Sequence, residues 1–308
     1  MTAINAMKFN ESSGGMVADS QSSNELRKYD ISDKVGSCAS SDGNLILMGG
    51  SGVSSILYEA KKVVFDKFNE KEFNTPQFVC ELSDLLTAVS RDIIEKEMKE
   101  RFGISSREYI AGKLNDGTPI GSHLLSPIGE VYTGSDRNIR QMLNNAFLVL
   151  GADRNGTSLY YIPMGNRPML LPIPYGTAGS GSDESDKVLC SFTRDLPREK
   201  KQDIPFVEGM FALITATNRS SEINQGVGGI LTIAYFDDGK IVTLGENESL
   251  LATEIVKCTD HNLLSRRDAL KSLEALLSQE KDCLKIEEKL LFKHPKHHEI
   301  MRFLRGYK

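Results

Sequence analysis

The stretch Gly14-Gly15-Met16-Val17-Ala18-Asp19-Ser20 is a short apolar run bounded by a glycine pair and two polar residues. Before it, residues 2–9 alternate loosely between apolar and polar side chains, and residues 10–15 have the composition of a turn. Apolar runs on either side of such a turn are typical of paired strands. The sequence therefore predicts a β-hairpin that begins at Thr2 and ends at Asp19.

Outward from this hairpin, strands and helices come in blocks. Residues 45–48 have the pattern of a buried strand. The helical spacing of apolar residues predicts one helix over 53–68 and a second that starts at Thr75. In the second helix, Thr75 is the expected N-cap and Pro76 the first helical residue. Further strands are predicted over 146–150, 159–162, 169–173, 230–236 and 241–244, and further helices over 183–192 and 205–218. Because strands do not alternate singly with helices, we expect an α+β fold of antiparallel sheets packed against helices.

Two segments lie outside this pattern. Residues 103–137 are dense in Gly, Ser and Pro and contain the pair Asp116-Gly117, which indicates a surface insertion with a small hairpin. From about residue 250 the chain becomes helical in pattern, with an apolar stripe of leucines between 270 and 277. We expect a main domain over residues 1–248, which carries the insertion, and a C-terminal helical extension over residues 249–308.

The composition restricts the class of protein. The chain has 308 residues, of which 40% are hydrophobic and 26% charged, as in globular proteins with an ordinary core. A net charge of −5 gives no reason to expect binding to nucleic acid or to an anionic membrane. We find no apolar run long enough to span a bilayer and no secretory signal pattern at the start. These features predict a cytoplasmic protein without nucleic-acid or membrane partners.

Cysteine and histidine are not arranged for metal binding. The five cysteines are scattered, odd in number and without CxxC spacing, which favours reduced, buried thiols over disulfides or metal ligands. His294, His297 and His298 lie in a basic stretch that is better explained as a solvated surface than as a metal site. We therefore expect neither a metal nor a cofactor.

Several landmarks follow one another along the chain. They are Met1-Thr2, the stretch 14–20, Lys34, Met48-Gly49-Gly50-Ser51-Gly52, the strand pair around 148–153 and 159–163, Gly179-Ser180-Gly181-Ser182 and Gly228-Gly229. Each of these motifs is common by itself. In this order and at these spacings they resemble the proteasome β-subunit family, including its bacterial ring-forming relatives, over roughly residues 2–245. The resemblance implies a four-layer αββα sandwich of an N-terminal-nucleophile hydrolase, with two antiparallel sheets flanked by helices.

The resemblance also implies a nucleophile. Thr2 matches the catalytic threonine of the family, exposed once Met1 is removed. A threonine hydroxyl is a poor nucleophile unless a base takes its proton. The free α-amine of the same residue suits this task, because its unperturbed pKa is about 7.7–8.0.

Four further residues match the family's catalytic positions. Lys34, held by Asp19, would place a positive charge beside the hydroxyl, and Ser180 would lie near the free amine. The backbone N–H of Gly50 would bind the developing oxyanion, a contribution of about 3 kcal/mol for one such donor.

One part of the family pattern is missing. Before the Gly-Gly pair the family carries Asp and, three positions later, Ser, whereas this chain has Asn224 and Val227. Glu222 lies nearby and would substitute for the missing carboxylate if the loop were longer. The orientation of Ser180 and of the free amine depends on this difference.

The resemblance implies a threonine-type endopeptidase that cleaves peptide or protein substrates through an acyl-enzyme inside a homo-oligomeric ring, with an ATP-dependent unfoldase as a further partner. Two alternatives remain open. In a transpeptidase or ligase an amine, instead of water, resolves the acyl-enzyme. A non-catalytic structural subunit is suggested by Asn224 and Val227. The 103–137 insertion and the C-terminal tail have no counterpart in the family and could hold a dedicated substrate.

Overall fold

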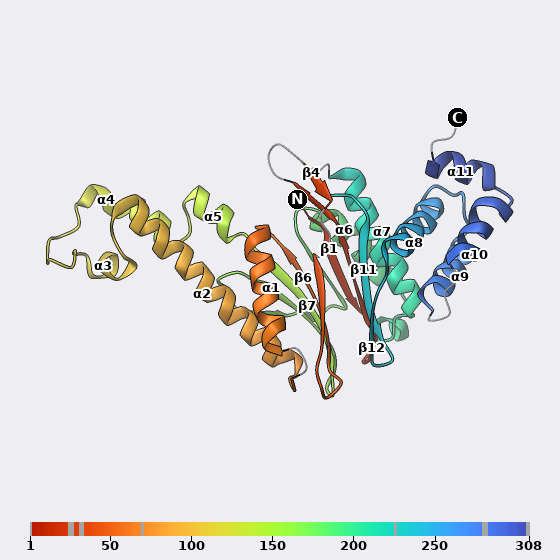
Figure 1. The fold of residues 1–308 in the computed structure, drawn as a ribbon, viewed down its shortest axis with the longest axis horizontal. Helices are drawn as coiled ribbons and strands as arrows, with labels where there is room; N and C mark the ends of the chain where they lie inside the picture. The colour runs from red at the N-terminus through yellow and green to blue at the C-terminus, as the bar shows by residue number, and fades with distance from the viewer. Residues whose placement is uncertain are drawn as a thin grey trace.

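The computed structural model describes residues 2–23, 28–30, 34–68, 71–224, 227–278 and 283–305. Two five-stranded antiparallel sheets lie face to face between layers of helices (Figure 1). The first sheet has the order β10 (Tyr175–Ala178), β1 (Ile4–Lys8), β2 (Gly14–Asp19), β11 (Leu231–Asp237) and β12 (Lys240–Thr243). The second has the order β5 (Val35–Ala39), β6 (Leu45–Ser51), β7 (Ala146–Asp153), β8 (Gly156–Pro163) and β9 (Met169–Leu170). A separate pair joins β3 (Gln21–Ser23) to β4 (Lys28–Asp30).

Helices cover the outer face of each sheet. The second sheet packs against α1 (Ser54–Phe68) and α2 (Thr75–Phe102). The first packs against α6 (Ser182–Asp195) and α7 (Phe206–Ile223), and the short 3₁₀ helix η1 (Arg198–Lys201) lies between these two in the chain. The predicted α+β sandwich with two antiparallel sheets is thus confirmed.

The hairpin of β1 and β2 shows why its sequence is continuously apolar. Ala6 pairs with Met16, and both side chains belong to the core between the two sheets. Met7 and Val17 point the other way, into the core beneath α7. Because side chains alternate along a strand and both faces of this sheet are covered, polar alternation is lost. The hairpin predicted over residues 2–19 is confirmed.

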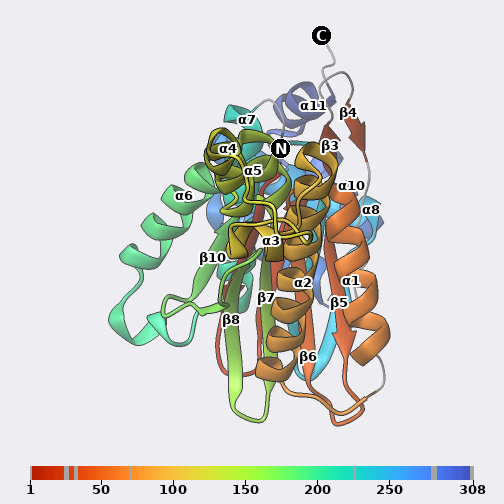
Figure 2. The same ribbon diagram turned by 90° about the vertical axis from the view of Figure 1, so that its left-hand side faces the viewer.

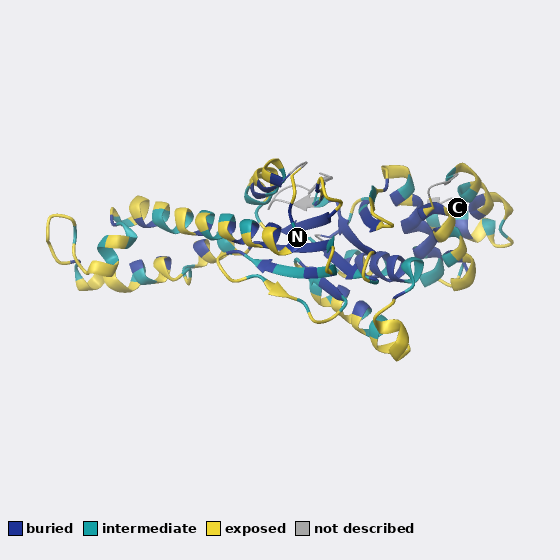
Figure 3. Cartoon of the chain, turned by 90° about the horizontal axis from the view of Figure 1, so that it is seen from below, coloured by how far each residue is buried: buried dark blue, intermediate teal, exposed yellow. Residues whose placement is uncertain are grey.

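The insertion is helical and forms a projecting arm. The second half of α2 extends beyond the sheets together with α3 (Ser106–Ala111), α4 (Ser122–Tyr132) and α5 (Arg137–Leu143), and we call these elements the arm (Figures 1 and 2). The arm has a small apolar core of its own, made of Met98, Ile104, Ile120, Ile128, Val131 and Ile139. Exposed residues dominate its surface, whereas buried residues concentrate in the sheets and the helices beside them (Figure 3).

The structure corrects several details of the sequence predictions. The small hairpin expected near residue 116 is a single bridge between Lys113 and Pro119. Asn74, and not Thr75, caps α2, because its side chain accepts a hydrogen bond from the backbone N–H of Gln77 at 2.9 Å. The strand expected over 169–173 ends at Leu170. The strand β10, which pairs with β1 directly before the Gly179-Ser180-Gly181-Ser182 motif, was not predicted from the sequence.

The chain continues after β12 in α8 (Glu246–Asp260), α9 (Arg266–Leu277), α10 (Cys283–Glu288), a π-helical segment (Lys289–Lys293) and α11 (His297–Arg305). The core beneath α7 runs on through Ile255, Leu273 and Ile300 of this region. The division into a domain over 1–248 and an extension over 249–308 stays a prediction. Within the described residues, no helix is both long enough and apolar enough to cross a membrane.

Candidate active site

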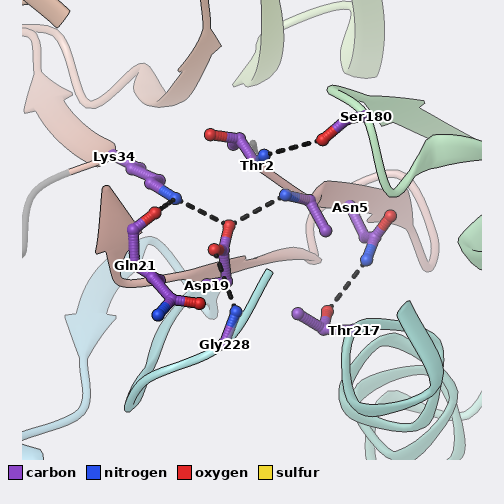
Figure 4. A network of polar contacts seen from close by, with 9 residues as sticks. Thr2, Asn5, Asp19, Gln21, Lys34, Ser180, Thr217 and Gly228 are labelled. Atoms are coloured by element: carbon purple, nitrogen blue, oxygen red, sulfur yellow. Dashed lines mark hydrogen bonds and ion pairs between the residues drawn. The ribbon is translucent and has the colours of Figure 1, made fainter. Parts of the chain in front are cut away.

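Thr2 and Asp19 lie at the same end of the β1–β2 hairpin, because the strands pair in antiparallel register. The backbone of Ala3 joins them: its N–H donates to Asp19 Oδ1 at 2.8 Å, and its carbonyl accepts from the Asp19 N–H at 3.1 Å. Behind β1, the side-chain amide of Asn5 donates to Thr217 Oγ1 of α7 at 2.8 Å. Hydrogen bonds from Ala3 to Asp19 and from Asn5 to Thr217 therefore fix the beginning of β1, next to Thr2 (Figure 4).

Asp19 is the centre of the polar network. Its side chain is completely shielded from solvent and lies 2.8 Å from Lys34 Nζ. Besides the Ala3 N–H, it accepts a hydrogen bond from the Gly228 N–H at 3.3 Å. Burial raises the pKa of Asp19 above its ordinary value, while the Lys34 ammonium and the two backbone N–H groups act in the opposite direction.

Lys34 is directed by two acceptors. Its ammonium donates to Asp19 Oδ1 and, at 2.5 Å, to the backbone carbonyl of Gln21. Only 12% of the side chain is exposed. A cation fixed in this way is an electrostatic element whose position does not depend on solvent. Asp19 and Lys34 were expected together from the sequence, and the structure brings them together.

Ser180 lies on the other side of Thr2. The Thr2 N–H donates to Ser180 Oγ at 3.1 Å, and the Gly181 N–H donates to the Thr2 carbonyl at 3.1 Å. Gly179 completes this turn with a φ of 100°, and a Cβ atom there would lie 2.1 Å from the Thr2 carbonyl oxygen. Only glycine fits this position, both for its backbone conformation and for the close approach of Thr2.

Gly50 lies near the site but its N–H is engaged. In β6 this N–H donates to the carbonyl of Lys34 at 3.2 Å, which extends the pairing of Val35 with Gly49 by one residue. An oxyanion donor must point at the substrate, so Gly50 would have to share or give up this hydrogen bond to act as one. Its role as oxyanion donor stays a prediction.

Asn224 and Val227, the two residues that depart from the expected pattern, make local contacts. Asn224 lies at the end of α7, where its side-chain amide donates to the Ser220 carbonyl at 3.2 Å. Val227 packs against the turn: a Cβ atom on Gly181 would lie 3.2 Å from its Cγ2. Glu222, considered as a substitute for the carboxylate, is still within α7 and pairs with Arg219 at 3.3 Å.

Three contributors to the site were not identified from the sequence: the Gln21 carbonyl, the Gly228 N–H and the Gly179 turn. The first two are backbone groups, so no side-chain type signals them. Gly179 stood in the Gly-Ser-Gly-Ser motif and could have been found from its glycine alone. Among the described residues, no group of three or more His, Cys, Asp and Glu side chains is placed to hold a metal ion.

The fold is similar to that of two solved structures of a protein called Anbu. One, described as an ancestral beta-subunit from Yersinia bercovieri, has a TM-score of 0.57 and 12% sequence identity, over 86% of this chain and 97% of that chain. The other, a Gly-1 mutant from Hyphomicrobium sp. strain MC1, has a TM-score of 0.52 and 10% identity, over 80% and 85% of the two chains. At these identities the likeness shows a shared fold alone. No family model matches the chain, and no curated protein matches it.

Proposed function

We propose that this chain is a proteasome β-type N-terminal-nucleophile hydrolase of the cytoplasm, a threonine-type peptidase that uses Thr2. One observation carries the proposal: the Ser180 hydroxyl contacts the Thr2 nitrogen, while Asp19, buried and paired with Lys34, accepts from the N–H of the next residue, Ala3. The similarity in fold to a protein described as an ancestral beta-subunit is consistent with it.

In the proposed reaction, cleavage of the Met1–Thr2 bond turns the Thr2 nitrogen from an amide into a free amine. The neutral amine takes the proton of the Thr2 hydroxyl while the oxygen attacks the substrate carbonyl carbon. The proton then passes to the leaving amine as the peptide bond breaks, which leaves an ester on Thr2. Water, deprotonated by the same amine, hydrolyses the ester and restores the hydroxyl.

Lys34 and Asp19 act on the charge that develops in this reaction. The ammonium of Lys34 lowers the free energy of the nascent alkoxide, and a preorganised charge does so without reorganisation during the step. Asp19 keeps the ammonium in place. Ser180, already 3.1 Å from the Thr2 nitrogen, would hold the amine and share its proton.

The decisive experiment is intact-mass analysis after treatment with an epoxyketone, an electrophile that needs both the hydroxyl and the free amine of an N-terminal threonine. The proposal requires loss of Met1 and one covalent adduct that maps to Thr2. Thr2→Ala is the matched control and should give no adduct. A protein that retains Met1 and stays unmodified contradicts the proposal.

A non-catalytic structural subunit is the second candidate, and the hydrogen bond from the Gly50 N–H to the Lys34 carbonyl favours it. In that case the epoxyketone leaves the protein unmodified although it folds and assembles. For the catalytic protein we propose a homo-oligomeric ring that encloses the sites, because a free peptidase in the cytoplasm would degrade other proteins. Multi-angle light scattering of the mature protein tests this part: a monomer that still reacts at Thr2 would favour the dedicated ligase.

A further inference from the structure

Two buried serines hold the Ser180 turn from behind. Ser220, on α7, donates its hydroxyl hydrogen to the Gly181 carbonyl at 2.8 Å. Ser185, on α6, lies with its hydroxyl oxygen 2.7 Å from that of Ser220, and both residues are completely shielded from solvent. A hydroxyl has one hydrogen to donate, and Ser220 uses its own on Gly181, so Ser185 is the donor at the 2.7 Å contact. The Ala216 carbonyl, the other acceptor near the Ser185 hydroxyl, lies farther away at 3.4 Å. The two serines form a directed chain that ends on Gly181.

Gly181 transmits this chain to Thr2. Its carbonyl is fixed by Ser220 and by the Ser185 N–H at 3.2 Å, while its own N–H donates to the Thr2 carbonyl at 3.1 Å. The neighbouring Ser180 accepts from the Thr2 N–H. One turn therefore contacts both backbone polar groups of the proposed nucleophile.

Packing leaves the turn little freedom to move. A Cβ atom on Gly181 would lie 2.9 Å from the Cβ of Ala3, 3.1 Å from that of Ser220 and 3.2 Å from Val227 Cγ2. Contacts this close leave no room for a side chain at Gly181 between β1 and α7. The hydroxyl of Ser220 adds the directional contact, which an apolar neighbour such as Val227 cannot supply.

We propose that Ser185 and Ser220 are positioning residues, which act through Gly181 to set the geometry between Ser180 Oγ and the Thr2 nitrogen. The inference rests on the proposed function. It explains how the Thr2 amine can be oriented in a chain that has Asn224 and Val227 where the family has Asp and Ser. Hydrogen bonds in series strengthen one another, so removing the first member weakens the second.

The test compares three hydroxyl deletions. Ser220→Ala removes the bond to Gly181. Ser185→Ala keeps that bond and removes the hydroxyl that donates to Ser220, together with its longer contact of 3.4 Å to the Ala216 carbonyl. Thr215→Val is the matched control, because the Thr215 hydroxyl on the same helix donates to the Phe211 carbonyl of its own helix at 2.8 Å. The readouts are the rate of epoxyketone addition at Thr2, measured across pH, and the melting temperature.

We expect the addition rate to fall about tenfold in Ser220→Ala and about threefold in Ser185→Ala, with no change in Thr215→Val. The fall of the rate at low pH, where the Thr2 amine becomes protonated, should also move to lower pH in Ser220→Ala. The Ser180 hydroxyl accepts a hydrogen bond from the Thr2 ammonium and so favours its charged form, and the variant loosens this contact. A serine that only joined two helices would change the melting temperature and leave the pH profile unchanged. Wild-type rates and pH profiles in both serine variants would overturn the inference.

Hydrogen exchange separates this inference from the proposed function. The Gly181 amide hydrogen should exchange faster in Ser220→Ala and at an unchanged rate in Thr215→Val. This measurement does not require an active protein. Faster exchange in a protein that never reacts with the epoxyketone would keep the positioning role of the serines and reject the peptidase. Unchanged exchange overturns the inference whatever the activity. If Ser220→Ala does not fold, the same measurements are made on Ser185→Ala, which keeps the bond to Gly181. Its addition rate, pH profile and Gly181 amide exchange then decide.

Discussion

Lys34 Nζ lies 2.8 Å from Asp19 Oδ1, and this carboxylate has no contact with solvent. Two backbone N–H groups and one carbonyl also contact the pair. A buried pair of this kind contributes little net stability, but removing one partner leaves a desolvated charge. The consequences for stability and for activity can be separated by mutation.

The first prediction is a double-mutant cycle on this pair. Asp19→Asn should lower the free energy of unfolding by about 3 kcal/mol, because it removes the buried carboxylate that lies 2.8 Å from the Lys34 ammonium. Adding Lys34→Met should restore more than half of that loss, since no buried charge is left. Urea unfolding measures both variants, and equal losses in the single and the double variant would contradict the assignment of the pair as buried and coupled.

The second prediction concerns pH. The folded-state pKa of Asp19 is raised above its ordinary 3.8, so its protonation favours the folded state, and this contribution is lost as pH rises through the folded-state pKa. Lys34→Met removes the largest opposing influence and moves the folded pKa further up. Relative to wild type, Lys34→Met should therefore lose stability as the pH rises above about 4 and through the raised folded-state pKa of Asp19. The Lys34→Met/Asp19→Asn variant should not show this loss, and a matching loss there would assign it to another group.

The third prediction concerns the turn at Gly179. Gly179→Ala should abolish reaction at Thr2 and destabilise the fold by more than the backbone strain alone, because the new Cβ would lie 2.1 Å from the Thr2 carbonyl oxygen. Gly117→Ala is the control: its φ is 90°, but no atom lies within 4 Å of the new Cβ. There we expect a loss of only about 1 kcal/mol. Equal losses in denaturant unfolding would mean that Thr2 does not approach Gly179 so closely.

The fourth prediction uses the cysteines as probes of the C-terminal helices. Cys258 of α8 is completely buried, and burial raises the pKa of its thiol to about 12. Cys80 and Cys190 are exposed. In the native protein iodoacetamide should therefore modify Cys80 and Cys190 and spare Cys258 until the fold is opened by denaturant. Peptide mass spectrometry reads out the order, and rapid native labelling of Cys258 would show that α8 separates readily from the sheet.

The sequence was most informative where local pattern and tertiary environment agree. The strands predicted over 230–236 and 241–244 are β11 and β12, and the turn residues between them, Asp238 and Gly239, both have positive φ. The spacing of apolar residues in α1 and α2 likewise matched the face that each helix buries. The hairpin that carries Asp19 belongs to the same group.

Long-range contacts explain what was missed. The strand Tyr175–Ala178 is short and contains a glycine, so no local pattern marks it, yet Gly176 lies between the sheets, where a Cβ atom would approach Leu171 to 2.6 Å. In the arm, α3 and α5 are short and α4 contains Pro127, so periodicity could not reveal these three helices. The engagement of the Gly50 N–H depends on the register of β5 against β6, which no local pattern specifies.

The arm also determines how the molecule moves through a solvent. A helix of 28 residues is about 42 Å long, and much of α2 stands clear of the sheets. Such a protrusion adds friction out of proportion to its mass. A single copy of 34.1 kDa should therefore elute from a sizing column ahead of a compact marker of equal mass and imitate a small oligomer. Sedimentation velocity would reveal this as an elevated frictional ratio, a signature of shape that is present before any subunit meets another.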